Sequence, residues 1–123
     1  MKIFFSKDTE LSEEESIERC CRLDVLVEVD DNFYHPYITM LIRIIQDMED
    51  ADLNNEIYHN DICQIIVKGV DKQSIIESIV YHYNHKYFDG FVPIDLQENI
   101  EFSSTQYSDI SNWVLVYDSE KNN

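Results

Sequence analysis

The chain has 123 residues, 44% of them apolar and 12% aromatic, which is enough apolar material for one domain with one core. Its 25 acidic and 9 basic residues give a formal net charge of −16. That charge argues against nucleic acid and anionic lipid as partners, because both bind surfaces rich in Lys and Arg, and it favours a basic protein. Solubility alone remains an alternative explanation.

The first part of the chain predicts a strand, a helix and a second strand. Residues 2–5 (KIFF) indicate a short strand, and Ser12 with Glu15 forms a capping box that predicts a helix over about 12–20. After it, apolar residues recur at every second position, which predicts a strand with one buried face. These residues are Leu23, Val25, Val27 and Val29.

The segment 36–49 fits two structures. Its apolar residues follow helical spacing, and Pro36 suits a first helical turn, but the letters YITMLIRII are also rich in strand formers. We favour a helix, with strand as the alternative. The residues with helical spacing are Ile38, Leu41, Ile42, Ile45 and Met48.

The remaining elements predict an α+β fold. Residues 62–68 indicate a buried strand, and Asp71 is placed to cap a helix over about 72–86. The apolar face of that helix is expected to contain Ile75, Ile76, Ile79, Val80 and Tyr83. Short extended pieces at Phe91–Ile94 and Ile100–Ser103, a strand at Trp113–Tyr117 and a frayed tail at 119–123 complete the chain. We therefore predict a single domain over 1–123, a mixed sheet with about three helices packed on it.

The cysteines and the apolar runs predict a cytoplasmic protein. Cys20, Cys21 and Cys63 are odd in number and two are adjacent, so no disulfide framework is indicated and a reducing compartment fits. The opening MKIFFSKDTE has no apolar run of signal-peptide length. The apolar run from Ile38 to Ile45 is too short to span a bilayer.

No motif in the chain predicts catalysis. His82 and His85 share a helix face and could hold a metal, but no second ligand pair has metal-like spacing. Cys63 lies in an apolar run, as a core thiol does. Asp30 and Asp31, like the cluster EDAD, are most simply acids on a solvated surface. We predict no enzyme, no metal and no cofactor.

The distribution of basic residues predicts a binding surface. No Lys or Arg lies between Arg43 and Lys68, or between Lys86 and Lys121, although both stretches are rich in acids and contain tyrosine. Acids left unpaired beside Tyr are typical of a surface that binds an Arg- and Lys-rich partner. The predicted partner-binding residues are Asp47, Glu49, Asp50, Asp52, Glu56, Tyr58, Asp89, Glu98, Glu101, Tyr107 and Asp109. Acidic loops with tyrosines in the core are the alternative.

In size, acidity, tyrosine content and lack of a catalytic motif, the whole chain resembles the immunity proteins of bacterial contact-dependent growth inhibition and polymorphic toxin systems. The resemblance implies a cognate basic toxin domain, an RNase or a DNase, that is neutralised by binding at its active site or substrate entry. It transfers no site residues. A DNA-mimic inhibitor of DNA-binding proteins and a small protein-interaction adaptor are the alternatives.

Overall fold

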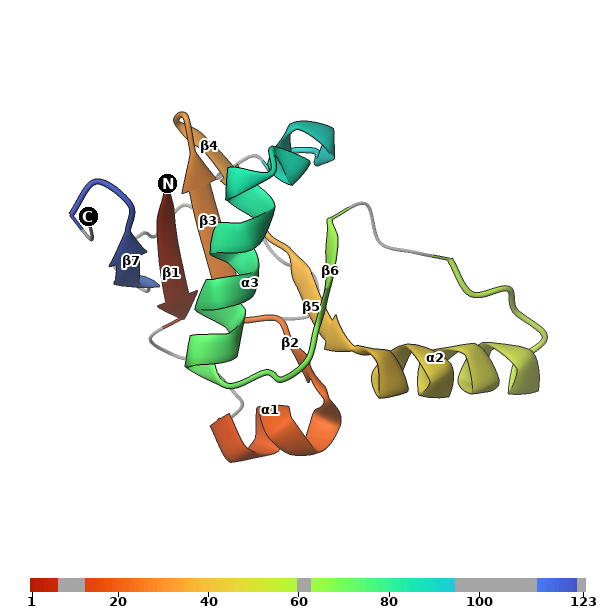
Figure 1. The fold of residues 1–123 in the computed structure, drawn as a ribbon. Helices are drawn as coiled ribbons and strands as arrows, with labels where there is room; N and C mark the ends of the chain where they lie inside the picture. The colour runs from red at the N-terminus through yellow and green to blue at the C-terminus, as the bar shows by residue number, and fades with distance from the viewer. Residues whose placement is uncertain (7–12, 60–62, 95–112, 122–123) are drawn as a thin grey trace.

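The computed structural model describes residues 1–6, 13–59, 63–94 and 113–121, which form two sheets and three α-helices (Figure 1). The antiparallel sheet has the order β4-β3-β1-β7, with β1 at Lys2–Ser6, β3 at Val25–Val29, β4 at Asn32–Tyr34 and β7 at Trp113–Asp118. The second sheet has the order β2-β5-β6, with β2 at Cys21–Arg22, β5 at Tyr37–Met40 and β6 at Gln64–Val67. The helices are α1 at Glu13–Arg19, α2 at Leu41–Leu53 and α3 at Lys72–Asn84, with a 3-10 turn η1 at Tyr87–Gly90. The predicted α+β class is confirmed, although the strands divide between two sheets.

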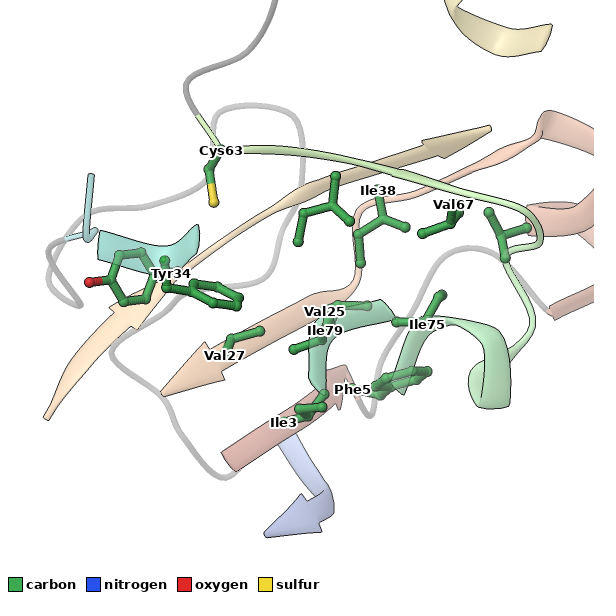
Figure 2. Packing of buried hydrophobic residues seen from close by; sticks show 13 residues of the cluster. Ile3, Phe5, Val25, Val27, Tyr34, Ile38, Cys63, Val67, Ile75 and Ile79 are labelled. Carbon is green, nitrogen blue, oxygen red and sulfur yellow. The ribbon is translucent and has the colours of Figure 1, made fainter. Parts of the chain in front are cut away.

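One core lies where both sheets meet α3. Figure 2 shows side chains from β1 and β3, from β5 and β6, and from α3 converging on it. Its buried members are Ile3, Phe5, Val25, Val27, Tyr34, Ile38, Cys63, Ile65, Val67, Val70, Ile75, Ile79 and Phe88. The predicted apolar face of α3 and the core position of Cys63 are confirmed.

Most strands and helices lie where the sequence places them. Strand β1 covers the predicted 2–5, α1 lies within the predicted 12–20, and β6 lies within 62–68. Strand β7 covers the predicted Trp113–Tyr117. Of the predicted extended piece Phe91–Ile94, the structure pairs Ile94 alone, in an isolated bridge to Phe33.

Two predictions about the chain's later part concern residues only partly described. The piece Ile100–Ser103 lies outside the described residues. In the predicted tail, Ser119 exchanges hydrogen bonds with Met1: the Ser119 N–H donates to the Met1 carbonyl at 2.9 Å, and the amino terminus donates to Ser119 Oγ at 2.8 Å. Residues 122–123 are again outside the described part.

The prediction of one alternating strand over residues 23–29 needs correction at its start. Leu23 is exposed and lies between β2 and β3, so the regular strand begins at Val25. Leu26 is also buried, against Trp113 in a smaller cluster away from the main core. Strand β3 is therefore covered on both faces, which a period-two pattern does not predict.

The acidic pair Asp30–Asp31 is the two-residue loop between β3 and β4. Both residues have positive φ, 51° and 66°, and Val29 pairs with Asn32 across the loop. Hairpin loops with two left-handed residues match the twist of the flanking strands, and Asp tolerates that conformation. The pair thus has a structural role.

The preference for helix over all of 36–49 is wrong for its first part. Tyr37–Met40 is a strand that pairs with β2 on one side and with β6 on the other, and only from Leu41 does the chain become helical. Ile38 and Thr39 are fully buried there, so two neighbouring strands outweigh the local spacing. Pro36 precedes the strand instead of starting a helix.

Asp71 caps α3 as predicted. Its carboxylate accepts a hydrogen bond from the Ser74 hydroxyl at 2.7 Å and another from the Ser74 N–H at 3.2 Å. The preceding Gly69 leaves room for this cap, because a Cβ there would lie 3.0 Å from Asp71 Oδ1. The local sequence therefore determines where α3 begins.

Replacing Asp71 with Ala is expected to lower the urea midpoint of unfolding at pH 7, because the Ser74 N–H loses its acceptor. The Ser74 hydroxyl and N–H hold the pKa of Asp71 below its ordinary value of 3.8. The ionised cap therefore stabilises the fold above that value, and this contribution is lost as the pH falls through the lower folded-state pKa. The difference between native and variant midpoints should shrink below about pH 4. Asp71→Asn, which caps without titrating, is the control, and a difference independent of pH would contradict the assignment.

Arg22 connects the two sheets. From β2 its guanidinium lies 4.7 Å from the centre of the Phe5 ring of β1, and Nη1 donates to the Val70 carbonyl at 3.1 Å. Its Nε and Nη2 donate to the two carboxylate oxygens of Asp24, at 2.7 and 3.4 Å. Because Arg22 is only 3% exposed, this ion pair is shielded from water, and each partner depends on the other.

Candidate functional site

Helix α2 extends away from the body of the protein (Figure 1). It connects the parallel strands β5 and β6, and a helix in that position usually packs against the sheet it crosses. In α2, however, Ile44 is the only buried residue. Its exposed residues, which exclude the partly buried Arg43, Asp47 and Ala51, are available for contacts outside the described chain.

The end of α2 turns the chain back beside the helix. Asn55 has a positive φ of 56° and donates to the Asp52 carbonyl at 3.2 Å, while the Glu56 N–H donates to the Ala51 carbonyl at 2.8 Å. These two bonds are those of a Schellman motif, in which Asn is an accepted left-handed residue. The motif directs Glu56 and the residues after it toward the side of α2.

An acidic hollow of about 240 Å³ lies between α2 and the returning segment. It is open to solvent, and Tyr58 beside it accepts a hydrogen bond from Gln64 Nε2 of β6 at 3.2 Å. The lining residues are Asp47, Asp50, Ala51, Asn54, Glu56, Ile57, Tyr58 and His59. Three carboxylates, a phenol and an exposed isoleucine together suit a long cationic side chain, with its charge among the acids and its stem on apolar surface.

Asp47 is the acid of this hollow whose charge is compensated. Arg43 Nε donates to Asp47 Oδ1 at 3.0 Å, and the Tyr37 hydroxyl donates to Oδ2 at 3.3 Å. Burial raises the pKa of Tyr37, and Cys21 and Asp47 raise it further, so the phenol stays a donor. Asp47 is therefore held in place before any partner arrives.

The other acids of α2 lie where they oppose the helix dipole. Asp50 and Asp52 are in its last turn, which contains no basic residue. The C-terminal end of a helix carries partial negative charge, so carboxylates there are unfavourable and a cation would be favourable. No Lys or Arg among the described residues forms an ion pair with Glu49, Asp50, Asp52 or Glu56. A cation from outside the described residues would therefore bind favourably at this end of α2.

The structure brings together four of the predicted partner-binding residues. Asp47, Asp50, Glu56 and Tyr58 line the hollow. Glu49 and Asp52 are exposed on the same helix but do not line the hollow. Asp89 lies in η1, which Figure 1 places on a different side of the body from α2.

The remaining predicted residues, Glu98, Glu101, Tyr107 and Asp109, lie outside the described residues. The hollow also contains four residues that were not predicted, namely Ala51, Asn54, Ile57 and His59. The Asn54–Asn55 pair at the end of an apolar helical pattern was the available signal for the turn.

The candidate metal residues do not form a cluster. Within 1–6, 13–59, 63–94 and 113–121, no three His, Cys, Asp or Glu side chains are grouped to hold a metal ion. The Nδ1 atoms of His82 and His85 lie 2.7 and 2.9 Å from the carbonyls of Ser78 and Tyr81, one helical turn back. Both rings also pack with Tyr87, and the His85 ring stacks on Tyr81 with centroids 4.0 Å apart. The two histidines thus belong to an aromatic cluster at the end of α3.

Comparison with protein-family models, curated proteins and solved structures finds no match to this chain. In the part of the chain that the structure describes, no helix is both long and apolar enough to cross a membrane.

Proposed function

We propose that this chain is a cytoplasmic immunity protein that neutralises a basic nuclease toxin domain, an RNase in the preferred interpretation. The observation that carries the proposal is the group of acids at the end of α2, which oppose the helix dipole and have no described cation beside them. Residues that lower local stability are commonly retained at functional sites. Positive charge on a partner would compensate them.

In this proposal the acids around the hollow occupy the site on the toxin that otherwise binds nucleic acid. A nuclease holds phosphates in a basic groove, and the carboxylates of Asp50 and Glu56 offer the same charge to that groove. Long-range attraction speeds the encounter, and close charge pairs across an interface contribute about 1.5–7 kcal/mol of coupling in measured cases. Tyr58 and Ile57 supply apolar area that excludes water around those pairs.

Neutralisation needs binding alone. A folded acidic domain over the active site or the substrate entry prevents the RNA from reaching the catalytic residues. The proposal therefore assigns the chain no chemistry, no cofactor and no nucleic-acid partner.

The experiment is a pull-down with the tagged protein from the native organism, at low and at moderate salt, with the retained proteins identified by mass. We expect one basic toxin domain to remain bound through moderate salt. Purified, that domain should degrade RNA or DNA, and an equimolar amount of this protein should abolish the activity.

Two outcomes would contradict the proposal. Several DNA-binding proteins that elute together as the salt rises would indicate a DNA mimic. If no basic protein is retained, or if the retained nuclease stays active in the complex, the chain is not an immunity protein.

A further inference from the structure

Helix α2 has a second exposed surface, an apolar ridge formed by Leu41, Ile42, Ile45 and Met48. These side chains are 61%, 53%, 48% and 46% exposed, although they have the spacing of a buried helix face. In the structure this face is therefore largely open to solvent. The ridge is on a different face of α2 from Asp47 and Asp50, which line the hollow.

The ridge runs directly into carboxylates. Residues three or four positions apart lie next to each other on the surface of a helix and form a row along it. One row passes from Leu41 through Ile45 and Met48 to Asp52, and the neighbouring row passes from Ile42 through Ile45 to Glu49. The first two turns of this surface are thus apolar and the following turn is acidic.

We propose that the ridge binds an amphipathic helix of the partner protein, whose apolar stripe continues into Lys or Arg. The apolar stripe covers the side chains of the first two turns, and the cations meet Glu49 and Asp52 at the negative end of α2. The 13 residues of α2 extend about 20 Å, enough for about three turns of a partner helix. The inference rests on the proposed function, since it describes a segment of that same basic partner.

Charge decides between this occupant and a second copy of the chain. Two copies would each carry a net charge of −16. Paired in parallel, their ridges would bring Asp52 and Glu49 against the same acids of the other copy. Paired antiparallel, they would place those carboxylates on apolar side chains without a partner, which is unfavourable. A basic amphipathic helix satisfies both parts of the surface.

The test uses a fluorescent synthetic helix of about 14 residues, about 21 Å long, with a leucine stripe that continues into arginines. One control peptide has the same composition in scrambled order, and another replaces the leucines with Gln. Anisotropy titrations compare the native protein with Ile45→Ser and with Val114→Ser, a matched control. Val114 is 47% exposed on β7, on the far side of the body from α2 (Figure 1). Thermal unfolding and sedimentation of all three proteins accompany the titrations.

We expect the striped peptide to bind more tightly than both controls, and Ile45→Ser to weaken it about ten-fold or more while Val114→Ser has no effect. Equal binding of scrambled and striped peptides would overturn the proposal. So would a fall in the melting temperature of Ile45→Ser alone, since that side chain would then be packed within the chain. A dimer that Ile45→Ser dissociates would assign the ridge to a second copy.

The inference and the proposed function fail separately. If Ile45→Ser still inhibits the nuclease with an unchanged dissociation rate, the ridge is not part of the interface although the protein is an immunity protein. If the striped peptide binds the ridge but no nuclease is inhibited, the ridge binds a basic helix of another class of partner.

Discussion

Replacing Arg22 with Met is expected to lower the free energy of unfolding by about 3–5 kcal/mol, the usual cost of removing one partner from a buried ion pair. The variant leaves the Asp24 carboxylate without its guanidinium and the Val70 carbonyl without a donor. The free energy of unfolding of a native protein is about 5–15 kcal/mol, so this loss would be a large fraction of the total stability. Urea unfolding followed by circular dichroism measures it, and Arg22→Lys provides a milder variant if the Met protein does not fold.

Arg43→Met is the matched control for this prediction. Arg43 also donates from Nε to an aspartate, Asp47, but the two side chains are 33% and 24% exposed, against 4% and 13% for Arg22 and Asp24. A partly exposed pair contributes about 0–1 kcal/mol, because water screens it. Similar losses in Arg22→Met and Arg43→Met would show that burial of Arg22 does not determine its contribution.

Neutralising Asp50, Asp52 and Glu56 together, as Asn, Asn and Gln, is expected to slow association with the inhibited nuclease about ten-fold or more at low ionic strength. The three carboxylates lie in or just after the last turn of α2, and no Lys or Arg among the described residues pairs with them. The variant's association rate should also depend less on salt, because fewer charges steer the encounter. Stopped-flow measurements at several salt concentrations give both quantities.

The control removes three charges elsewhere. Asp30→Asn, Asp31→Asn and Glu77→Gln alter the net charge equally, and Asn is tolerated at the two left-handed positions of the hairpin loop. The association rate of this control variant should fall much less than that of the variant of Asp50, Asp52 and Glu56. If both triple variants associate equally slowly, the effect is due to net charge, and the hollow is not part of the interface.

Stability separates a binding effect from misfolding. Two of the neutralised acids lie at the negative end of α2, so the variant of Asp50, Asp52 and Glu56 should unfold at the same temperature as the native protein or higher. A lower melting temperature would mean that these acids stabilise the fold.

Some of the candidate site was predictable from the sequence. The absence of Lys and Arg between Arg43 and Lys68 indicated unpaired acids there, and Asp50, Glu56 and Tyr58 do share one hollow. Asp47 lies in it too, but Arg43 pairs with this acid. The position of Ile57 beside them was not predictable, because it depends on how the chain turns after Asn55. Nor did the sequence indicate that Arg22, two residues from Asp24, is buried between the sheets.

Elements whose local signals agree can be located from the residue pattern without knowledge of their surroundings. Asp71 as a cap and the apolar positions Ile75 and Ile79 locate α3, because both effects act within a few residues of the chain. The surplus of acid likewise follows from composition. It required no knowledge of the fold.

The conformation of residues 37–53 depends on which elements lie beside them in the folded chain. The same β-branched and apolar side chains suit a strand or a helix, and Tyr37–Met40 is a strand because β2 and β6 provide hydrogen bonds on both sides. Beyond Met40 no such neighbours exist among the described residues, so the chain coils into α2, with Leu41, Ile42 and Ile45 left exposed. Helical spacing marks a face that can be buried, but which surface covers it depends on what lies across from it in space.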